Sequence, residues 1–555
     1  MKVRLLLLYL LISIYTPLLA QFNQPSPRYE ARAVWLTTIG GIDWPHSYAQ
    51  TPSSIDRQKR ELVAILDKLQ KAGINQVLLQ TRIRATTIYP SVYEPWDGCL
   101  SGQPGKSPGY DALAFAIDEC HRRGMELHAW VVAIPVGKWN GAGCRNLRKR
   151  NLKMLKRIGD EGFLNPEMPQ TAGYIADICE EIVRNYDVDG IHLDYIRYPE
   201  NWNIKVTPTL GRSFITRIVK AIHDRIKPIK PYVKLSSAPI GKHDDLTRYQ
   251  SYGWNAYRRV CQDAQGWLRD GLMDQLFPMM YFQGRQFFPF AIDWSENSYG
   301  RIVTPGLGIY FLSPKEKDWP LEIISREMHV LRQYGLGHAF FRSKFFTDNT
   351  KGIYDFTLKH NASPALVPPM TWANSTAPAA PTCLALDRNH VLTWQKTVTG
   401  GDIYYNVYSS PSHPVDITDG RNLIAARVSG NAVKVGNSDR MYYAVTAMNR
   451  YGVESGALQM EPRGDLSFAN PSAALSCDGR KLILPHSQEV WERNVVLLVT
   501  DVQGNPVLAS AWKGQTLDVS KIAPGVYHLY VLTSRGVRHR CGYFVIRRYC
   551  DEWRG

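Results

Sequence analysis

Residues 186–199 carry a group of ionisable and aromatic side chains directly after a short apolar run. The run ends at Asp194, and Tyr195, Arg197 and Tyr198 follow it closely. A strand with an apolar body and an ionisable end is typical of a βα-barrel, where strand bodies fill the core and strand ends line the active site. We therefore predict that Asp194 is a catalytic carboxylate. The alternatives are that it caps the next helix or pairs with Arg197.

A carboxylate in this position suits hydrolysis of a glycosidic bond, which needs two carboxyl groups. Asp194 would attack, or would stabilise an oxocarbenium-like centre. For the second carboxyl we predict Glu94, because Tyr93, Pro95 and Trp96 beside it could raise its pKa by desolvation. Helix capping or a loop salt bridge is the alternative role for Glu94. Four other carboxyls stay open as the second member, namely Asp43, Glu200, Asp245 and Asp293.

Aromatic and hydrogen-bonding side chains near the predicted strand ends are candidate sugar contacts. Aromatic rings there could stack on sugars, although such rings are often only packed; they are Trp35, Trp96, Trp130 and Tyr281. Side chains that could bind hydroxyls or the carboxylate of an anionic sugar are Gln80, Arg82 and Arg197. His128, His192 and Tyr198 complete this set, but both histidines lie on strand bodies and could be hydrogen-bonded core groups. We expect no metal, because no Asp or Glu ligand shares the histidine spacing, and no cofactor.

The elements that position these residues alternate between short apolar runs and amphipathic stretches of helical period. We predict strands at residues 31–37, 76–80, 126–132, 190–194, 233–239, 275–281, 304–310 and 338–341. Predicted helices cover 53–71, 111–123, 170–185, 213–226, 254–270 and 321–334, with Ser53 or Ser54 as the first cap. Eight such strands predict one (β/α)₈ barrel, α/β in class, over residues 28–362.

The pattern changes to all-β after a linker at residues 363–380 that is rich in Pro, Ala, Ser and Thr. Residues 381–462 resemble a fibronectin type III sandwich in Trp394, the strand around Tyr405 and the strand 442–449. Residues 463–555 predict a second β-sandwich, whose segments 499–505 and 517–527 resemble the C-terminal sorting domains of Bacteroidetes secreted proteins. We expect the barrel to fold without these modules.

The first twenty residues read as a secretory signal peptide, with Lys2 and Arg4 before an apolar run that ends at Ala20. We therefore expect an exported protein, in the periplasm, on the outer surface or secreted, with no membrane contact beyond export or surface attachment. Nine cysteines leave at least one thiol unpaired, and their pairing cannot be read from the sequence. The formal charge of +16 suits an anionic polymer or surface. Without a nucleic-acid motif, and with export, nucleic acid is not an expected partner. Oligomeric state is not predicted.

Several segments, in order along the barrel, resemble the family-10-like glycosidases of exported bacterial proteins. The matching segments are residues 30–35, 93–96, 102–111, 121–130, 164–166, 189–195 and 278–281. The resemblance implies a barrel that hydrolyses glycosidic bonds, with Asn165 among the site residues. It also implies a cell-wall substrate, since some members are associated with stripped glycan strands of peptidoglycan. Residues 131–136 depart from the family pattern of Asn-Pro-Tyr-Arg, so a sugar contact from that Asn or Arg is not expected here.

The sequence therefore predicts an exported glycoside hydrolase acting on a cell-wall or other complex glycan. The alternative is a non-catalytic glycan-binding or cell-surface protein on a degenerate barrel. A second carboxyl within about 5–10 Å of Asp194 would favour the enzyme.

Overall fold

The computed structural model describes residues 26–397, 401–436, 441–460, 474–484, 496–512, 514–532 and 538–547. The predicted signal peptide lies outside these residues. No helix in the described ranges is both long and apolar enough to cross a membrane.

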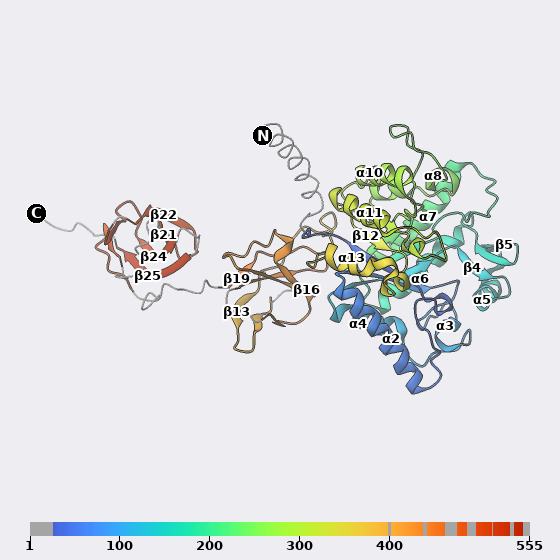
Figure 1. The fold of residues 1–555 in the computed structure, drawn as a ribbon, viewed down its shortest axis with the longest axis horizontal. Coiled ribbons are helices and arrows are strands. Elements are labelled where there is room, and N and C mark those ends of the chain that lie inside the picture. Colours follow the sequence, from blue (N-terminus) through green and yellow to red (C-terminus); the bar gives the residue numbers. More distant parts are fainter. Residues whose placement is uncertain are drawn as a thin grey trace, which may run out of the picture.

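A closed barrel of parallel strands forms the larger part of the molecule (Figure 1). Its strands are β1 (Arg32–Leu36), β2 (Gln76–Arg82), β3 (Glu126–Val132), β7 (Gly190–Asp194), β8 (Lys234–Ser237), β9 (Gln275–Leu276), β10 (Ile302–Val303), β11 (Gly306–Leu307) and β12 (His338–Phe340). Their order is β10-β9-β8-β7-β3-β2-β1-β12-β11. β10 and β11 follow one another on a single stretch of chain, so the two ends of this order meet and the sheet closes.

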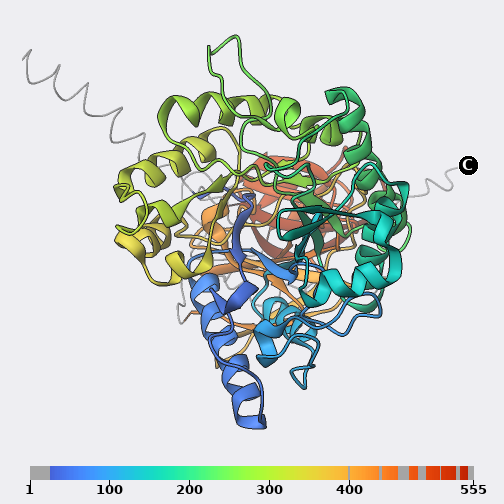
Figure 2. The same cartoon turned by 90° about the vertical axis from the view of Figure 1, so that its right-hand side faces the viewer.

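Helices surround the ring of strands, as the view along the barrel shows (Figure 2). The longer ones are α2 (Pro52–Lys71), α4 (Ala112–Arg122), α6 (Pro169–Asn185), α7 (Pro208–Ile226), α9 (Ala264–Arg269), α10 (Phe288–Glu296), α11 (Leu321–Gln333) and α13 (Ile353–His360). The shorter ones are α3 (Gly98–Ser101), α8 (Ala256–Arg259) and α12 (Ser343–Thr347). Each long helix buries the apolar stripe that its 3.6-residue period creates, for example Leu62, Leu66 and Leu69 on α2.

The predicted strands and most predicted helices are present, with ends that differ from the predicted ones by up to about five residues. Two local predictions are wrong. The cap of α2 is Thr51, whose side chain accepts a hydrogen bond from the Ser54 amide in a capping box. The single helix predicted at 254–270 is two short helices, α8 and α9, because Cys261 adopts a left-handed conformation with φ 56° between them.

An insertion between β3 and α6 was not predicted as a unit, and we call residues 135–164 the arm. It holds β4 (Pro135–Lys138), α5 (Ala142–Asn151), η2 (Leu152–Met154), β5 (Leu155–Ile158) and β6 (Glu161–Leu164). The three strands form an antiparallel sheet in the order β4-β6-β5. α5 rests on the barrel through Gly143, where an added Cβ would lie 2.4 Å from the Ala85 carbonyl oxygen and 2.5 Å from that of Arg84.

Two small β-sandwiches follow the barrel. The first pairs a three-stranded sheet, β13 (Thr382–Leu386), β14 (Val391–Gln395) and β17 (Ala432–Lys434), with a four-stranded sheet, β16 (Leu423–Val428), β15 (Tyr404–Ser410), β18 (Tyr442–Met448) and β19 (Leu458–Gln459). Trp394 from one sheet and Tyr405 from the other share its core. The second holds β20 (Lys481–Ile483) with β23 (Thr516–Asp518), and β22 (Pro506–Ala511), β21 (Val496–Thr500), β24 (Gly525–Leu532) and β25 (Arg538–Ile546).

Buried ion pairs fasten the first sandwich to the end of the barrel where the strands begin. Arg427 donates to Glu126 at 3.1 Å and to Asp189 at 2.7 Å, and all three side chains are less than a tenth exposed. Arg450 donates to Asp187 at 2.8 Å. The chain connecting the two bodies is also buried at Leu366. The barrel and the first sandwich therefore share an interface, which the few apolar residues of the predicted linker did not suggest.

Eight of the nine cysteines lie in the described residues, and all eight are free thiols. Cys120 and Cys179 are buried in the barrel core. Cys550 lies outside the described residues.

Candidate active site

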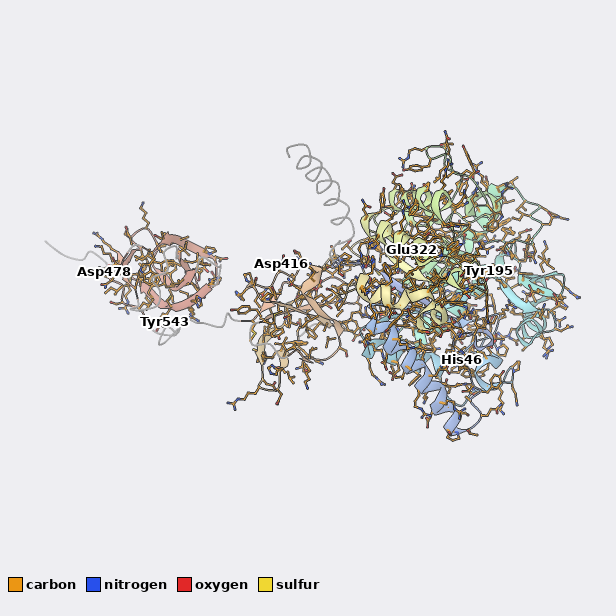
Figure 3. All side chains as sticks on the ribbon, in the orientation of Figure 1. His46, Tyr195, Glu322, Asp416, Asp478 and Tyr543 are labelled. Atoms are coloured by element: carbon orange, nitrogen blue, oxygen red, sulfur yellow. The ribbon has the colours of Figure 1, made fainter. Side chains whose placement is uncertain are left out.

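A cavity of about 470 Å³ opens at the end of the barrel where the strands finish. Strand ends, the loop after β7 and the arm all contribute to its wall. The residues lining it are Thr37, Ile39, Ile42, Gln80, Ile83, Arg84, Trp130, Val132, Pro135, Gly137, Glu161, Phe163, Asp194, Tyr195, Pro199, Glu200, Asn201 and Phe341. Tyr195, labelled in Figure 3, lines this cavity together with Pro135 and Glu161 of the arm. The cavity is thus an open cleft at the site where a βα-barrel carries its chemistry.

Asp194 is the last residue of β7, and both of its carboxylate oxygens are held. The Tyr195 amide donates to Oδ1 at 2.7 Å, and Trp130 Nε1 donates to Oδ2 at 3.2 Å. The Tyr195 backbone that follows is left-handed, with φ 51°. Burial raises the pKa of Asp194 above its ordinary value, although the charge of Arg197 and these two hydrogen bonds oppose the shift. The carboxylate is therefore oriented and partly withdrawn from water.

Two further carboxyls, Glu200 and Glu161, line the same cavity. Arg197 donates to Glu200 at 2.6 Å. Burial alone would raise the pKa of Glu200, but the bond and charge of Arg197 outweigh it and the pKa is lowered. Glu161 belongs to the arm, and its nearest cations, Arg84 and Lys138, lie 3.8 Å away. Glu200 is thus held ionised, whereas Glu161 is more loosely paired.

One aromatic ring lines the cavity near β12, and two others pack behind it. Phe341 lines it directly, and its ring centroid lies 5.5 Å from that of Tyr281 and 5.9 Å from that of Tyr310. Burial raises the pKa of Tyr281 well above its ordinary value, and the charges of Tyr310 and Asp194 add to the shift. Tyr281 therefore keeps its proton and lies close enough to Asp194 to sense its charge.

A second cavity of about 660 Å³ adjoins the first, since Arg84 and Gly137 line both. The arm contributes Val136 and Lys138 to it, and Tyr48, whose side chain is exposed, lines another part. Together the two cavities make an extended groove, which suits a chain of several sugars better than a single one.

Glu94 does not lie in this groove, so the prediction that it is the second catalytic carboxyl is wrong. Its side chain is buried and paired with Arg82, whose Nη2 lies 2.7 Å from Oε1. Tyr174 donates to the same oxygen at 2.7 Å. Arg82, predicted as a sugar contact, also donates to the Ala133 carbonyl at 3.0 Å and is buried. The salt bridge that was the alternative role of Glu94 is the one observed.

The two strand histidines and Trp35 lie in the barrel core and not among the cavity residues, which corrects their prediction as sugar contacts. Trp35 Nε1 donates to His192 Nε2 at 3.0 Å, and His192 Nδ1 lies 3.1 Å from Ser236 Oγ. Burial, with the charge of His128, lowers the pKa of His192 well below its ordinary value, so it is neutral. His128 packs lower in the barrel, 3.2 Å from Glu126.

Some of the other predicted sugar contacts lie in or just behind the cavity wall, and the rest lie elsewhere. Among them, Gln80 and Trp130 line the cavity beside Asp194. Arg197 and Tyr281 act from just behind its wall, as described above. Three residues lie elsewhere: Trp96 in the loop after β2, Asn165 in the turn before α6, and Tyr198 buried against Trp202.

Of the four alternative candidates for the second carboxyl, only Glu200 lines the groove. Asp43 is buried and pairs with Arg342. Asp245 accepts from the Gly253 amide at 3.1 Å, and Asp293 accepts from Gln265 at 2.8 Å. Each of these three has structural partners that account for it.

Sequence reasoning missed Tyr195, Arg84, Phe341 and Glu161 as site residues. Tyr195 follows Asp194 and Arg84 follows a strand end, so position alone could have indicated both. Glu161 carried no such signal, because it enters the cavity from the arm.

The barrel and its cavity define the class of protein to which the chain belongs. Residues 30–210 and 207–311 match the family described as Glycosyl hydrolase-like 10, more than half of the chain. The chain belongs to this family and is a glycoside hydrolase. It is 31% identical over 397 residues to Glycosyl hydrolase YngK of Bacillus subtilis (strain 168), covering 65% of this chain and 77% of YngK. Glycosyl hydrolase DigH of Escherichia coli (strain K12) is 29% identical over 289 residues, 45% of this chain and 65% of DigH.

Solved structures resemble the barrel more distantly. α-L-fucosidase isoenzyme 2 from Paenibacillus thiaminolyticus has a TM-score of 0.41 at 14% identity, covering 63% of this chain and 52% of that one. The PgaB (BpsB) glycoside hydrolase domain from Bordetella bronchiseptica has a TM-score of 0.39 at 12% identity, covering 59% of this chain and 99% of that one. Likenesses this distant identify neither a shared substrate nor shared site residues.

Proposed function

We propose that this chain is an exported hydrolase of a complex glycan, most directly the glycan strands of a bacterial cell wall, and that Asp194 is its catalytic carboxylate. One observation carries the assignment: Asp194 ends β7 inside a cavity that two other carboxyls share. The predicted signal peptide supports export. The extended groove, and the resemblance to a family with members associated with stripped peptidoglycan strands, support the substrate.

The chemistry follows from the environments of the three carboxyls. Asp194, held by Trp130 and the Tyr195 amide, faces the anomeric carbon as a carboxylate and either attacks it or stabilises its positive charge. Glu161 is the candidate proton donor to the departing sugar oxygen, because it lines the same cavity and Arg197 holds the other carboxyl, Glu200, ionised. Water completes the reaction, leaving a free reducing end on one product and a hydroxyl on the other.

The two sandwiches belong to the same proposal. Sheets of three and four strands around Trp394 support a fibronectin type III-like domain over residues 381–462. Residues 463–555 form a sorting-like module, which directs the exported protein to the outer surface. The barrel occupies residues 28–362, joined to the first sandwich by residues 363–380.

Asp194→Asn is expected to lower hydrolysis of stripped peptidoglycan strands by roughly 10³-fold, since a neutral amide can neither attack nor stabilise a cation. The melting temperature should be unchanged or slightly higher, because burial disfavours the ionised carboxylate that the substitution removes. Strand binding should persist. The measurements are reducing-end release, strand affinity and melting temperature on one preparation, and near wild-type turnover of a folded variant would refute the assignment.

Glu161→Gln and Glu200→Gln test the proton donor with the same chemistry. Aryl glycosides with an acidic phenol as leaving group need little protonation, so Glu161→Gln should retain much more activity on them than on natural strands. Glu200→Gln serves as the matched variant and should show no such selective recovery. Wild-type protein that binds strands but cleaves neither strands nor any of a panel of other polysaccharides would instead indicate a non-catalytic glycan-binding protein.

A further inference from the structure

The arm carries an unusual concentration of positive charge at the mouth of the barrel. Its thirty residues, 135–164, hold eight Lys and Arg side chains and two acidic ones, a net formal charge of +6. The whole chain of 555 residues carries +16. More than a third of the net charge therefore lies in a small part of the chain that also forms the cavity wall.

Most of these cations have no internal carboxylate to neutralise them. Lys138 pairs with Asp160 at 2.6 Å. Within the part of the chain that the structure describes, the other seven have no salt bridge; they are Arg145, Arg148, Lys149, Arg150, Lys153, Lys156 and Arg157. Like charges held together without counter-charges repel one another, so an anionic partner would relieve this repulsion.

The arm is a fixed platform, because its own contacts hold it in place. The Asn146 side chain donates to the Tyr93 carbonyl at 2.9 Å, and Arg150 donates to the Val92 carbonyl at 2.9 Å. Trp139 packs against two guanidinium groups, with Arg148 4.7 Å and Arg157 5.6 Å from its ring centre. Arg145, Lys149, Arg150, Lys153 and Arg157 nonetheless remain exposed. The charges are therefore preorganised and available to a ligand.

The arm also lies along the groove in which a glycan would bind. Pro135, Gly137, Glu161 and Phe163 line the cavity that holds Asp194. Val136 and Lys138 line the adjoining cavity. A polymer long enough to leave the first cavity through the second would follow the arm. A membrane surface or a nucleic acid has no such connection to the reacting centre.

We infer that the arm binds an acidic polysaccharide, holding carboxylates that recur along the sugar chain while another part of that chain lies at Asp194. This inference rests on the proposed function, whose substrate it narrows to glycans with regularly spaced negative charges. Cations at the arm would contribute to strand affinity and salt dependence, and not to the bond-breaking step itself.

The test uses the full chain and two forms of one polymer. Stripped peptidoglycan strands carry a free lactyl carboxylate on each muramic acid, and coupling them to methylamine with a carbodiimide removes that charge without shortening the strand. The arm variant is Arg145→Gln/Lys149→Gln/Lys153→Gln, which removes three exposed cations and keeps the Arg150 contact that holds the arm to Val92. The matched control, Arg57→Gln/Arg60→Gln/Lys71→Gln, removes three exposed cations from α2, none of which has a salt bridge among the described residues.

The arm variant is expected to bind native strands at least about fivefold more weakly at low salt, the combined effect of three exposed charge contacts. Its affinity for amidated strands, and its turnover of an aryl glycoside, should match wild type and the α2 control. The salt dependence of native-strand binding should become shallower.

Three results would overturn the inference. One is wild-type affinity of the arm variant for native strands. Another is an equal loss on native and amidated strands, which would mean a structural or charge-independent role. The third is loss of binding to vesicles of anionic phospholipid with no loss of strand binding. If the protein binds strands through their carboxylates but does not cleave them, the inference stands and the proposed hydrolysis is refuted. If the protein cleaves strands but the arm variant binds them as tightly as wild type, the proposed hydrolysis stands and the inference is refuted.

Discussion

At the scale of single residues, the site is built on the turn that follows β7. The position of Asp194 at the end of a barrel strand could be predicted, because an apolar run that ends in a carboxylate is typical of a βα-barrel. The roles of His192 and Trp35 could not, because they depend on which side chains point into the closed barrel. Trp35 reaches across that interior to His192, a contact between residues 157 positions apart.

Glu94 shows why a carboxyl in an aromatic loop is an ambiguous signal. The same burial that would raise the pKa of an unpaired carboxyl also favours a buried ion pair when an arginine is near. Arg82 is only twelve residues away in the chain, and its Nε and Nη2 both donate to the Glu94 carboxylate. Sequence spacing alone did not reveal that the two side chains meet.

Glu94→Gln is therefore expected to act on stability and not on chemistry. Leaving Arg82 buried without its counter-charge should lower the free energy of unfolding by about 3–5 kcal/mol. Turnover per folded molecule should stay near wild type, in contrast to Asp194→Asn. Denaturant unfolding and strand hydrolysis on the same preparation provide the measurement. A stable Glu94→Gln protein without activity would restore Glu94 as a catalytic candidate.

At the scale of elements, the barrel was predictable and the arm was not. The barrel strands are continuous apolar runs with turn residues between them, which is a strong local signal. In residues 145–157 a run of basic residues gives no apolar pattern, and the structure places α5, η2 and β5 there. The arm sheet joins short strands that carry little apolar pattern, so only tertiary contacts define it.

Gly143 is the contact that seats α5 on the barrel, and we expect Gly143→Ala to displace the arm. The new Cβ would lie 2.4 Å from a backbone oxygen, and the neighbouring backbone cannot turn aside as a flexible side chain would. Polymer hydrolysis and melting temperature should both fall. Gly173→Ala in α6 is the matched control, with nothing within 4 Å of its added Cβ, and it should gain roughly 0.5–1 kcal/mol of helix stability. Equal melting temperatures for wild type and Gly143→Ala would show that the arm is not seated there.

At the scale of the whole molecule, the barrel and the first sandwich stabilise each other. Removal of the sandwich would take Arg427 from Glu126 and Asp189, so we expect a barrel expressed alone to fold with a lower free energy of unfolding. The few apolar residues in the linker suggested no interface between the barrel and the sandwich. The interface depends instead on ion pairs between residues far apart in the sequence, which no local sequence pattern indicates.

Arg427→Ala is expected to destabilise the protein by about 1.5–3 kcal/mol, because two buried carboxylates lose a charged hydrogen-bond donor and keep only their partners within the barrel, Lys234 and His121. Arg421→Ala, which removes an exposed pair with Asp419 on the same sandwich, should change stability by less than about 1 kcal/mol. Thermal and denaturant unfolding of both variants decide the matter. Similar unfolding curves for the two would mean that the interface contributes little.

The same interface determines how the protein could be attached to a solid support. The first sandwich meets the barrel at the end where the strands begin, and the arm lies at the other end (Figure 1). The chain before the barrel arrives there too, since an added Cβ on Gly420 of the sandwich would lie 2.5 Å from the Ser26 carbonyl oxygen. A tag placed in the sequence either before the barrel or after the first sandwich would therefore attach the molecule to a bead by the end where the barrel strands begin. Immobilised in this orientation, the mouth would stay open to long, insoluble polymers.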